Sequence, residues 1–284
     1  MDLDFLNLLP DDEKEKITGL LKPCLKLSFE AAPDLPLTAS RLGGRGYLPK
    51  SIPYPRTRTS GKPLSLLAQI NFAEMPPLED FPERGLLSFY IIGADDDFEE
   101  LWGLSHENQI DDNGFRVMYF ADNLEESYSE AEQAAVFEQE GCKVFLPVSS
   151  WSGLSIKMTG KPGLSHPLTD CAESAKIFGG QYFYEYFADL LGEDSAAFQK
   201  LSEAFGSQSH LISGYPYFTQ YDPRLENDPD GEFDTLLLQL DIDGSENDGW
   251  SLMWGDAGVG NFFINRERLK ELDFDRVLYN WDCC

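Results

Sequence analysis

One pattern occurs twice in this chain of 284 residues, and it constrains the fold more than any other feature. A glycine opens a loop rich in tyrosine and proline, and an arginine closes it at the same spacing, in Gly46–Arg56 and again in Gly214–Arg224. Each loop precedes an apolar segment with a central glutamine, Gln69 or Gln239, and then a second apolar segment. Such a recurrence predicts a duplicated unit. We therefore expect an α+β fold in which two related antiparallel β units pack together, with helices at the periphery.

The repeats are predicted at about residues 41–92 and 210–264 of a single domain that spans residues 1–284. Strands show themselves as period-two alternation or as short continuous apolar runs. Strands are expected at residues 24–31, 64–72, 85–92, 115–120, 144–146 and 276–282. A further strand is expected in a segment that contains Trp151. The segment 33–62 is rich in proline and glycine, which predicts an ordered loop.

Helices are expected where apolar residues recur at helical spacing or where capping residues stand. An N-terminal helix is predicted at about residues 10–22. Ser129 begins a capping box of the form Ser-x-x-Glu, and Gly141 ends the helix that follows. The spacing between residues 178 and 205 indicates two helices, and Asn265 predicts the cap of a short final helix.

The charge balance restricts the class of partner. With 50 acidic and 22 basic side chains, the formal net charge is −28, so phosphate backbones and anionic membranes are repelled. We therefore expect no nucleic-acid and no membrane partner, whereas a basic protein is a natural partner. The alternative is that the acidic surface serves solubility alone.

The start of the chain and the cysteines indicate a compartment. No cationic start leads into an apolar run, and no stretch approaches the roughly 18 apolar residues of a spanning helix, so we expect a cytoplasmic protein. The five cysteines form no C-x-x-C pair, which predicts free thiols. The adjacent Cys283 and Cys284 are either redox-active, metal-capturing or packed under the last strand.

The sequence offers no catalytic or metal signature. Its histidines, His106, His166 and His210, stand in unrelated contexts, and no Gly-x-Ser-x-Gly elbow is present. The glycine of the acidic segment 241–248 falls outside calcium-loop register, so at most a weak cation site follows there. We therefore predict no catalytic residue, no cofactor and no metal site.

Four polar residues of the repeats are candidate binding residues. Gln69 and Gln239 stand in apolar strands, where an amide must be hydrogen-bonded. They either lock the two repeats together or face a shared cleft. Arg56 and Arg224 each follow a proline and either pair with carboxylates to fix their loops or take part in binding.

Aromatic residues concentrate in the second repeat. Tyr215, Tyr217 and Trp254 are the candidates among them, with Tyr221 and Trp250 close in sequence. Such a concentration is typical of a recognition surface, and equally of a small β core.

Several segments carry a family resemblance. Residues 46–49, 62–71, 85–91, 254–258 and 281–283 together resemble the YwqG family of bacterial proteins of unknown function. That family is more remotely similar to the eukaryotic programmed cell death protein 2 group, which is thought to act as chaperones for a ribosomal protein. Members of the YwqG family also occur near bacterial toxin systems. The resemblance implies a chaperone or immunity role and brings no catalytic residue with it.

The resulting hypothesis is a non-enzymatic protein-binding module, chaperone-like or toxin-immunity-like. It would present an acidic, aromatic-lined surface to a basic partner protein. The alternative is a small-ligand binder or an unrecognised hydrolase that uses a cleft between the two repeats.

Overall fold

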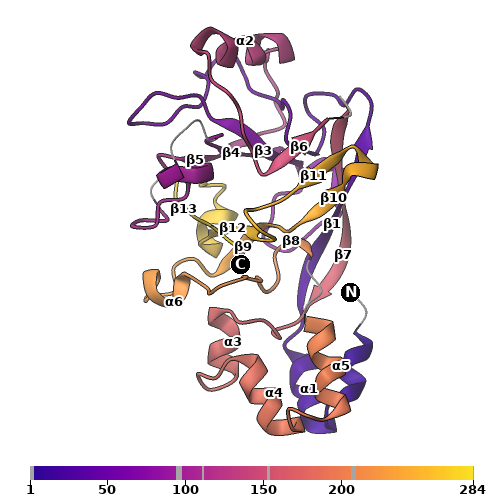
Figure 1. Cartoon of the computed structure of the whole chain (residues 1–284). Helices are drawn as coiled ribbons and strands as arrows, with labels where there is room; N and C mark the ends of the chain where they lie inside the picture. Colours follow the sequence, from indigo (N-terminus) through magenta and orange to yellow (C-terminus); the bar gives the residue numbers. More distant parts are fainter. Residues whose placement is uncertain (1–2, 94–97, 111, 152–153, 206–208, 284) are drawn as a thin grey trace.

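The computed structural model describes residues 3–93, 98–110, 112–151, 154–205 and 209–283. Its centre is one large antiparallel sheet, with helices above and below it (Figure 1). The sheet coils until its two ends approach each other, and the rings of Phe115 and Tyr279, from the two end strands, lie 5.2 Å apart. The α+β class expected from the sequence is thus confirmed.

Ten strands form this sheet, and two long strands, β1 (Lys22–Ala32) and β7 (Ser155–Ser165), pair at its middle along their whole lengths. On the β7 side follow β2 (Arg41–Leu42), β3 (Ser65–Asn71), β4 (Leu86–Ile91) and β5 (Phe115–Phe120). On the β1 side follow β8 (His210–Ile212), β9 (Thr235–Leu240), β12 (Val259–Ile264) and β13 (Val277–Asp282). We call these two groups of four strands the first half and the second half.

The two halves have matching registers. A row of paired residues crosses each half, and the rows are Arg41, Gln69, Ser88 and Met118 in the first half and Leu211, Gln239, Asn261 and Asn280 in the second. On this register the edge strand β5 corresponds residue by residue to the edge strand β13. Val117 therefore corresponds to Tyr279, and Phe120 corresponds to Asp282.

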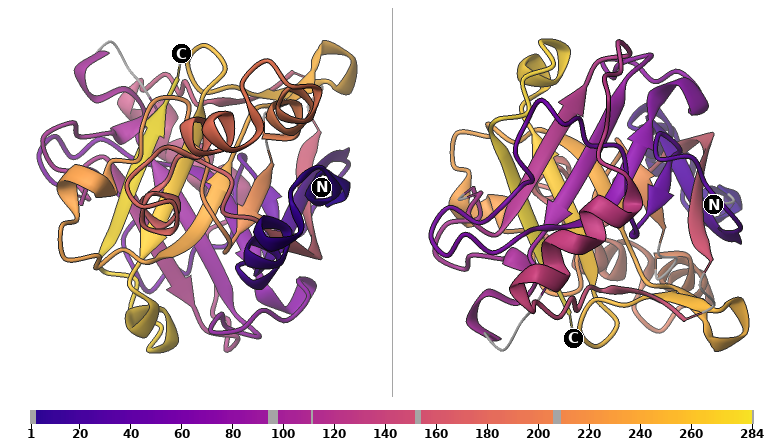
Figure 2. Two further views of the ribbon diagram at one scale, coloured as in Figure 1. Left: turned by 90° about the horizontal axis from the view of Figure 1, so that it is seen from below. Right: turned by 90° about the horizontal axis from the view of Figure 1, so that it is seen from above.

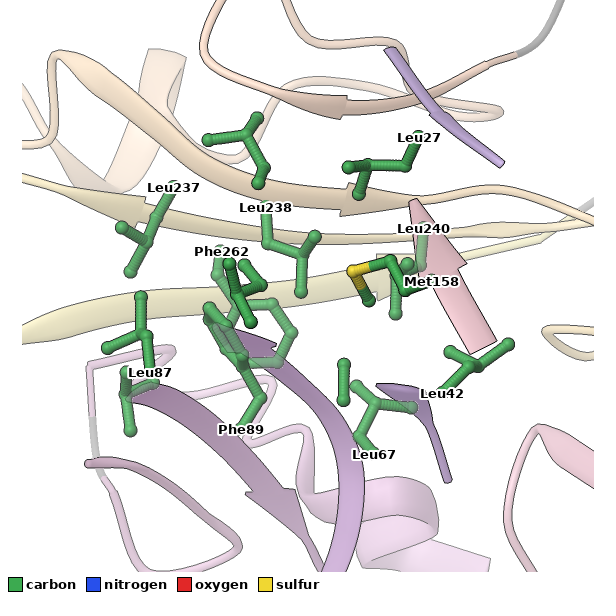
Figure 3. Packing of buried hydrophobic residues seen from close by; sticks show 14 of the residues in the cluster. Leu27, Leu42, Leu67, Leu87, Phe89, Met158, Leu237, Leu238, Leu240 and Phe262 are labelled. Atoms are coloured by element: carbon green, nitrogen blue, oxygen red, sulfur yellow. The ribbon is translucent and has the colours of Figure 1, made fainter. Parts of the chain in front are cut away.

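The inner faces of the two halves pack against each other. Figure 3 shows Leu67, Leu87 and Phe89 of the first half facing Leu238 and Phe262 of the second. The rings of Phe89 and Phe262 lie 4.9 Å apart, and all five side chains are fully buried. Burial of apolar area on this scale is the main stabilising term for such a sheet.

Most helices form a layer of their own at one end of the molecule (bottom of Figure 1). This layer contains the 3₁₀ helix η1 (Asp4–Leu8) and the helices α1 (Asp11–Gly19), α3 (Ala172–Ile177), α4 (Phe183–Leu191) and α5 (Ala196–Phe205). Buried residues such as Ile17, Phe187 and Leu201 hold the layer together. The predicted helix at 10–22 is shorter than expected, because Lys22 already pairs with Ser165 in the sheet.

The remaining helices lie elsewhere. The helix α2 (Glu130–Glu140) covers the outer face of the first half (right view of Figure 2), and the capping box at Ser129 and the left-handed Gly141 confirm both of its predicted ends. Asn265 caps α7 (Arg266–Lys270), as predicted. The short elements are α6 (Arg224–Asn227), η2 (Phe72–Glu74), η3 (Phe98–Gly103) and η4 (Glu246–Asp248). No helix of the described ranges is both long and apolar enough to span a bilayer.

A second, three-stranded sheet contains β10 (Asp243–Ser245), β11 (Trp250–Leu252) and β6 (Val148–Ser150), with β11 in the middle. The strand predicted at 144–146 is wrong, whereas the strand predicted around Trp151 is displaced, since β6 ends at Ser150 and the Trp151 N–H still donates to the Gly249 carbonyl at 3.2 Å. Residues 144–146 cover Trp102 instead, whose indole N–H donates to the Phe145 carbonyl at 3.2 Å. Trp151 follows the end of β6 and is about half exposed.

The described cysteines, Cys24, Cys142, Cys171 and Cys283, are free thiols. Burial raises the pKa of Cys171 to about 12, which makes it unreactive at neutral pH. Cys283 packs against Gly255, where an added Cβ would lie 2.5 Å from the Cys283 sulfur. Cys284 lies outside the described residues.

Candidate protein-binding site

The two glutamines of the repeats have closely similar surroundings. Gln69 is fully buried, and its Oε1 accepts a hydrogen bond from the Tyr47 N–H at 2.8 Å. Its Nε2 donates to the carbonyls of Leu37 and Ala39, at 2.8 and 2.9 Å. The side chain therefore anchors the loop of the first half onto the sheet of the same half.

Gln239 does the same in the second half. Its Oε1 accepts from the Tyr217 N–H and its Nε2 donates to the Ser209 carbonyl, both at 2.7 Å. Neither glutamine bonds to the other half, so the expectation that they lock the two repeats together is wrong. Neither faces a shared cleft, because apolar side chains fill the space between the halves.

The two arginines pair with carboxylates. Arg224 is buried, and its Nη2 lies 2.6 Å from Asp222 Oδ2 and 2.8 Å from Glu173 Oε2. Burial disfavours its charge, but the two carboxylates outweigh that cost and raise its pKa. Arg56 lies near the surface, where its Nη2 contacts Glu140 Oε1 at 2.6 Å. Both arginines therefore fix loops, which was the first of the two readings offered by the sequence.

The loop register differs from the one that the sequence suggested. Tyr47 and Tyr217 occupy equivalent places, since each N–H binds the glutamine of its own half. Gly46 packs against Gln69, whereas Gly214, with φ of 95°, packs against Ser165. The shared spacing from glycine to arginine thus does not reflect equivalent positions.

The predicted aromatic candidates are mostly part of the core. Tyr215 is buried, and its hydroxyl donates to the Leu20 carbonyl at 2.8 Å. Tyr215, Tyr217 and Gln239 line a cavity of about 30 Å³, which is the size of a water site. Trp254 is fully buried, and its ring stacks on Trp281 at 6.2 Å. These residues shape the fold around a binding surface rather than form one.

A surface groove of about 570 Å³ runs beside the edge strand β5. Consecutive residues 116–121 of β5 and its continuation line it along one side. The other sides come from the loop residues 47–52 and from residues 272–275, which precede β13. The groove therefore follows the free edge of the large sheet.

The backbone of β5 is open toward this groove. The Ile92 N–H donates to the Gly114 carbonyl, which identifies the pairs of β4 and β5 that exchange hydrogen bonds. In the alternating antiparallel pattern, Val117 and Tyr119 belong to the other pairs, so their backbone N–H and carbonyl groups point away from β4. Among the described residues, no hydrogen bond reaches the N–H or carbonyl of Val117 or Tyr119 from the outer side.

The edge of β13 differs at the corresponding place. There the Tyr279 N–H, which corresponds to that of Val117, donates to the Gln109 carbonyl at 3.0 Å. The Tyr279 hydroxyl also donates to the Trp102 carbonyl. At this position the chain itself pairs the outward N–H of β13, whereas the described residues leave the corresponding N–H of β5 unpaired.

The groove combines apolar walls with acidic ends. Tyr119 stacks on Phe274 with ring centres 5.5 Å apart, and Leu272 is about two-fifths exposed. Glu125 and Asp275 line the groove and take part in no ion pair within the described part of the chain. An exposed strand edge with side-chain pockets can accept an extended peptide as an additional strand.

Reasoning from the sequence missed this site. Residues 115–120 were predicted as a strand, and the bounds of β5 confirm it. Only the pairing order places this strand at an edge, and no local pattern records that order.

The chain belongs to the family described as a domain of unknown function, DUF1963, whose profile matches residues 40–283. The match covers both repeats and leaves out the N-terminal helix and β1. No curated protein matches the chain.

Proposed function

We propose that this protein is a non-enzymatic binding module that holds an extended basic segment of a partner protein along β5. The observation that carries the proposal is that the outward N–H and carbonyl of Val117 and Tyr119 have no hydrogen-bond partner in the described part of the chain, beside a groove that six consecutive residues line. An added strand would bond to the N–H and carbonyl groups of Val117 and Tyr119. Its alternate side chains would enter the apolar part of the groove.

Charge supports a basic partner. The net charge of −28 would steer a cationic segment toward the molecule. At the groove, Glu125 and Asp275 are available to cationic side chains, whereas the cation Arg116 is already paired with Asp112 at 3.0 Å. A segment with alternating apolar and basic residues fits both the walls and the ends of the groove.

The resemblance to the YwqG family and to the programmed cell death protein 2 group is compatible with this activity. A module that shields an extended basic segment would act as a chaperone or as an immunity protein. We place it in the cytoplasm, which the free thiols of the described cysteines favour.

We also propose that the sheet arose by internal duplication. From the middle of the sheet toward either edge, four strands follow one another in chain order. The row of paired residues through Gln69 in the first half has the same register as the row through Gln239 in the second half. The symmetry axis would pass between Ser28 and Thr159, which lie opposite each other at the middle with their hydroxyl oxygens 2.9 Å apart. On this proposal the duplicated unit is larger than residues 41–92, since it includes β5 and its counterpart β13.

The alternative hypothesis required a cleft between the repeats for a small ligand or a hydrolytic reaction. The side chains of Phe89, Phe262 and their neighbours fill that space. We therefore favour the protein-binding module over this alternative.

The proposal can be tested with a labelled ten-residue peptide that alternates lysine and valine, followed by fluorescence polarisation. We expect the full chain to bind it and to release it at high salt, because salt screens exposed charges. A peptide that alternates glutamate and valine should not bind. Equal binding of the acidic peptide would contradict the proposal.

A substitution in the edge strand β5 can show whether the peptide binds by adding a strand or only through attraction between opposite charges. Val117→Pro removes an N–H that points outward, which an edge strand tolerates, but it also changes a buried side chain, so circular dichroism must first show that the variant is folded. It should weaken binding at least about tenfold, the equivalent of a lost hydrogen bond or two. Val117→Ala keeps the N–H while it also shortens the buried side chain, and it should bind like the parent. Unchanged binding by Val117→Pro would refute the proposed mode.

A further inference from the structure

A second pocket, of about 300 Å³, lies at the end of β13, at the other edge of the sheet. It lies between Leu101 and Gln109 on one side and the loop residues Gln220 and Tyr221 on the other, with Asp282 of β13 among its lining residues. Its volume is at the lower end of the range for small-molecule sites. It is separate from the groove beside β5.

The pocket contains a buried carboxylate without a counter-charge. Asp282 is 8% exposed, and its Oδ2 accepts a hydrogen bond from the Gln220 N–H at 2.7 Å. None of the cationic side chains in the described ranges lies within ion-pair distance of it. Burial raises its pKa, as expected for a desolvated carboxylate, and the neighbouring donors of Gln220 and Thr219 offset part of this rise. Such a group is costly to bury unless a cation or several donors approach it.

Aromatic faces accompany the carboxylate. Tyr221 lines the pocket and is about half exposed. Trp281 lines it too, and its orientation is fixed because its indole N–H donates to the Leu101 carbonyl at 3.0 Å. Aromatic faces attract cations, and guanidinium groups stack on them especially well.

Neutral amides form part of the lining, to which His106, Leu104 and Cys283 also belong. Asn227 Nδ2 donates to Gln109 Oε1 at 3.0 Å, and Gln109 Nε2 donates to Asn280 Oδ1 at 2.7 Å. This chain of hydrogen bonds joins the α6 region, the segment before β5 and the strand β13. It makes a rigid polar wall that carries no positive charge.

Strand pairing alone does not require the carboxylate, although it also holds the loop residue Gln220. The residue that corresponds to Asp282 in the first half is Phe120, at the end of β5. The same position in the sheet thus accepts an apolar ring. An aspartate at this position needs a reason beyond strand pairing.

We infer that this pocket binds a guanidinium group, with Asp282 as the anionic partner and the half-exposed ring of Tyr221 as the stacking surface. The group can come from a free small molecule or from an arginine side chain of a partner protein. The inference does not depend on the strand-addition site, because it uses neither β5 nor its groove.

The test uses the full chain and follows intrinsic tryptophan fluorescence, since Trp281 lines the pocket. One titration uses agmatine, and another uses an N-acetylated, amidated peptide with a single arginine among glycines and serines. Saturable binding of either probe supports the site, and the probe that binds identifies the source of the group. An otherwise identical peptide with citrulline, which is neutral, should not bind.

Asp282→Asn is the matched variant, because it removes the charge and keeps an oxygen acceptor for the Gln220 N–H. It should melt no lower than the parent at pH 7, and it should bind at least about tenfold more weakly, as expected when a charged hydrogen bond is lost. Tyr221→Ala, at a half-exposed site, should weaken binding several-fold without unfolding the chain. Binding that is unaffected by both substitutions, or no binding of either probe, would overturn the inference.

Discussion

Replacing Gln69 by leucine should destabilise the protein strongly, although the new side chain is apolar and of similar size. The substitution removes the hydrogen bonds to the Tyr47 N–H, the Ala39 carbonyl and the Leu37 carbonyl. Tyr47 and Ala39 are buried, while Leu37 is partly exposed, so water can reach only the last group. At about 1–3 kcal/mol for each buried polar group left unpaired, we expect a loss of about 3–5 kcal/mol in the free energy of unfolding.

Gln239→Leu is the internal comparison. It leaves only the Tyr217 N–H and the Ser209 carbonyl unpaired, and both residues are partly exposed, so we expect a smaller loss of about 1–3 kcal/mol. Gln199→Leu, on the exposed side of α5, should change stability by about 0.5 kcal/mol or less. Urea unfolding followed by circular dichroism measures all three.

The order of these effects is the test of the reasoning. A Gln69→Leu variant within about 1 kcal/mol of the parent would refute the claim that this amide anchors the loop. A larger loss for Gln239→Leu than for Gln69→Leu would refute the assignment of its cost to buried backbone groups.

Three further predictions concern stability. Burial raises the pKa of Asp241 from 3.8 to about 6, so the folded state holds this proton more tightly; relative to Asp241→Asn, the parent should lose about 2 kcal/mol as pH rises from 4 to 6, and parallel pH profiles of the two in urea unfolding would contradict this. Arg224→Leu leaves the carboxylates of Asp222 and Glu173 without their cation and should cost about 3–5 kcal/mol, measurable as a lower urea midpoint; a midpoint like that of the parent would count against the buried ion pair. Ser129→Ala removes the cap of α2 and should cost about 1 kcal/mol in thermal unfolding, unless the capping box contributes nothing.

Local signals made much of the secondary structure predictable. The strand at 115–120 alternates buried and partly buried residues, and its predicted bounds equal those of β5. The capping box at Ser129 and the cap at Asn265 were recognised because a cap depends on residues within one helical turn. The strand predicted around Trp151 is displaced because strand ends are the least predictable part of a sequence pattern, and β6 ends one residue earlier, at Ser150.

The candidate site could not be predicted in the same way. Gln69 and Gln239 were recognised as unusual, since a buried amide needs partners, but the sequence does not tell whether those partners are loops or the other repeat. Trp254 was expected at a binding surface and is core, because composition alone does not separate the two. The open edge at Val117 depends on which strands pair across the whole sheet, and that information is not local.

Amide hydrogen exchange along β5 tests the central claim most directly. The full chain would be incubated in D₂O with and without a saturating amount of the lysine–valine peptide. We predict slower exchange at Val117 and Tyr119, whose N–H groups would bond to the added strand, and no change at Tyr279, whose N–H already has an acceptor in Gln109. Bound peptide without protection at Val117 and Tyr119 would contradict the proposal that this edge receives the partner.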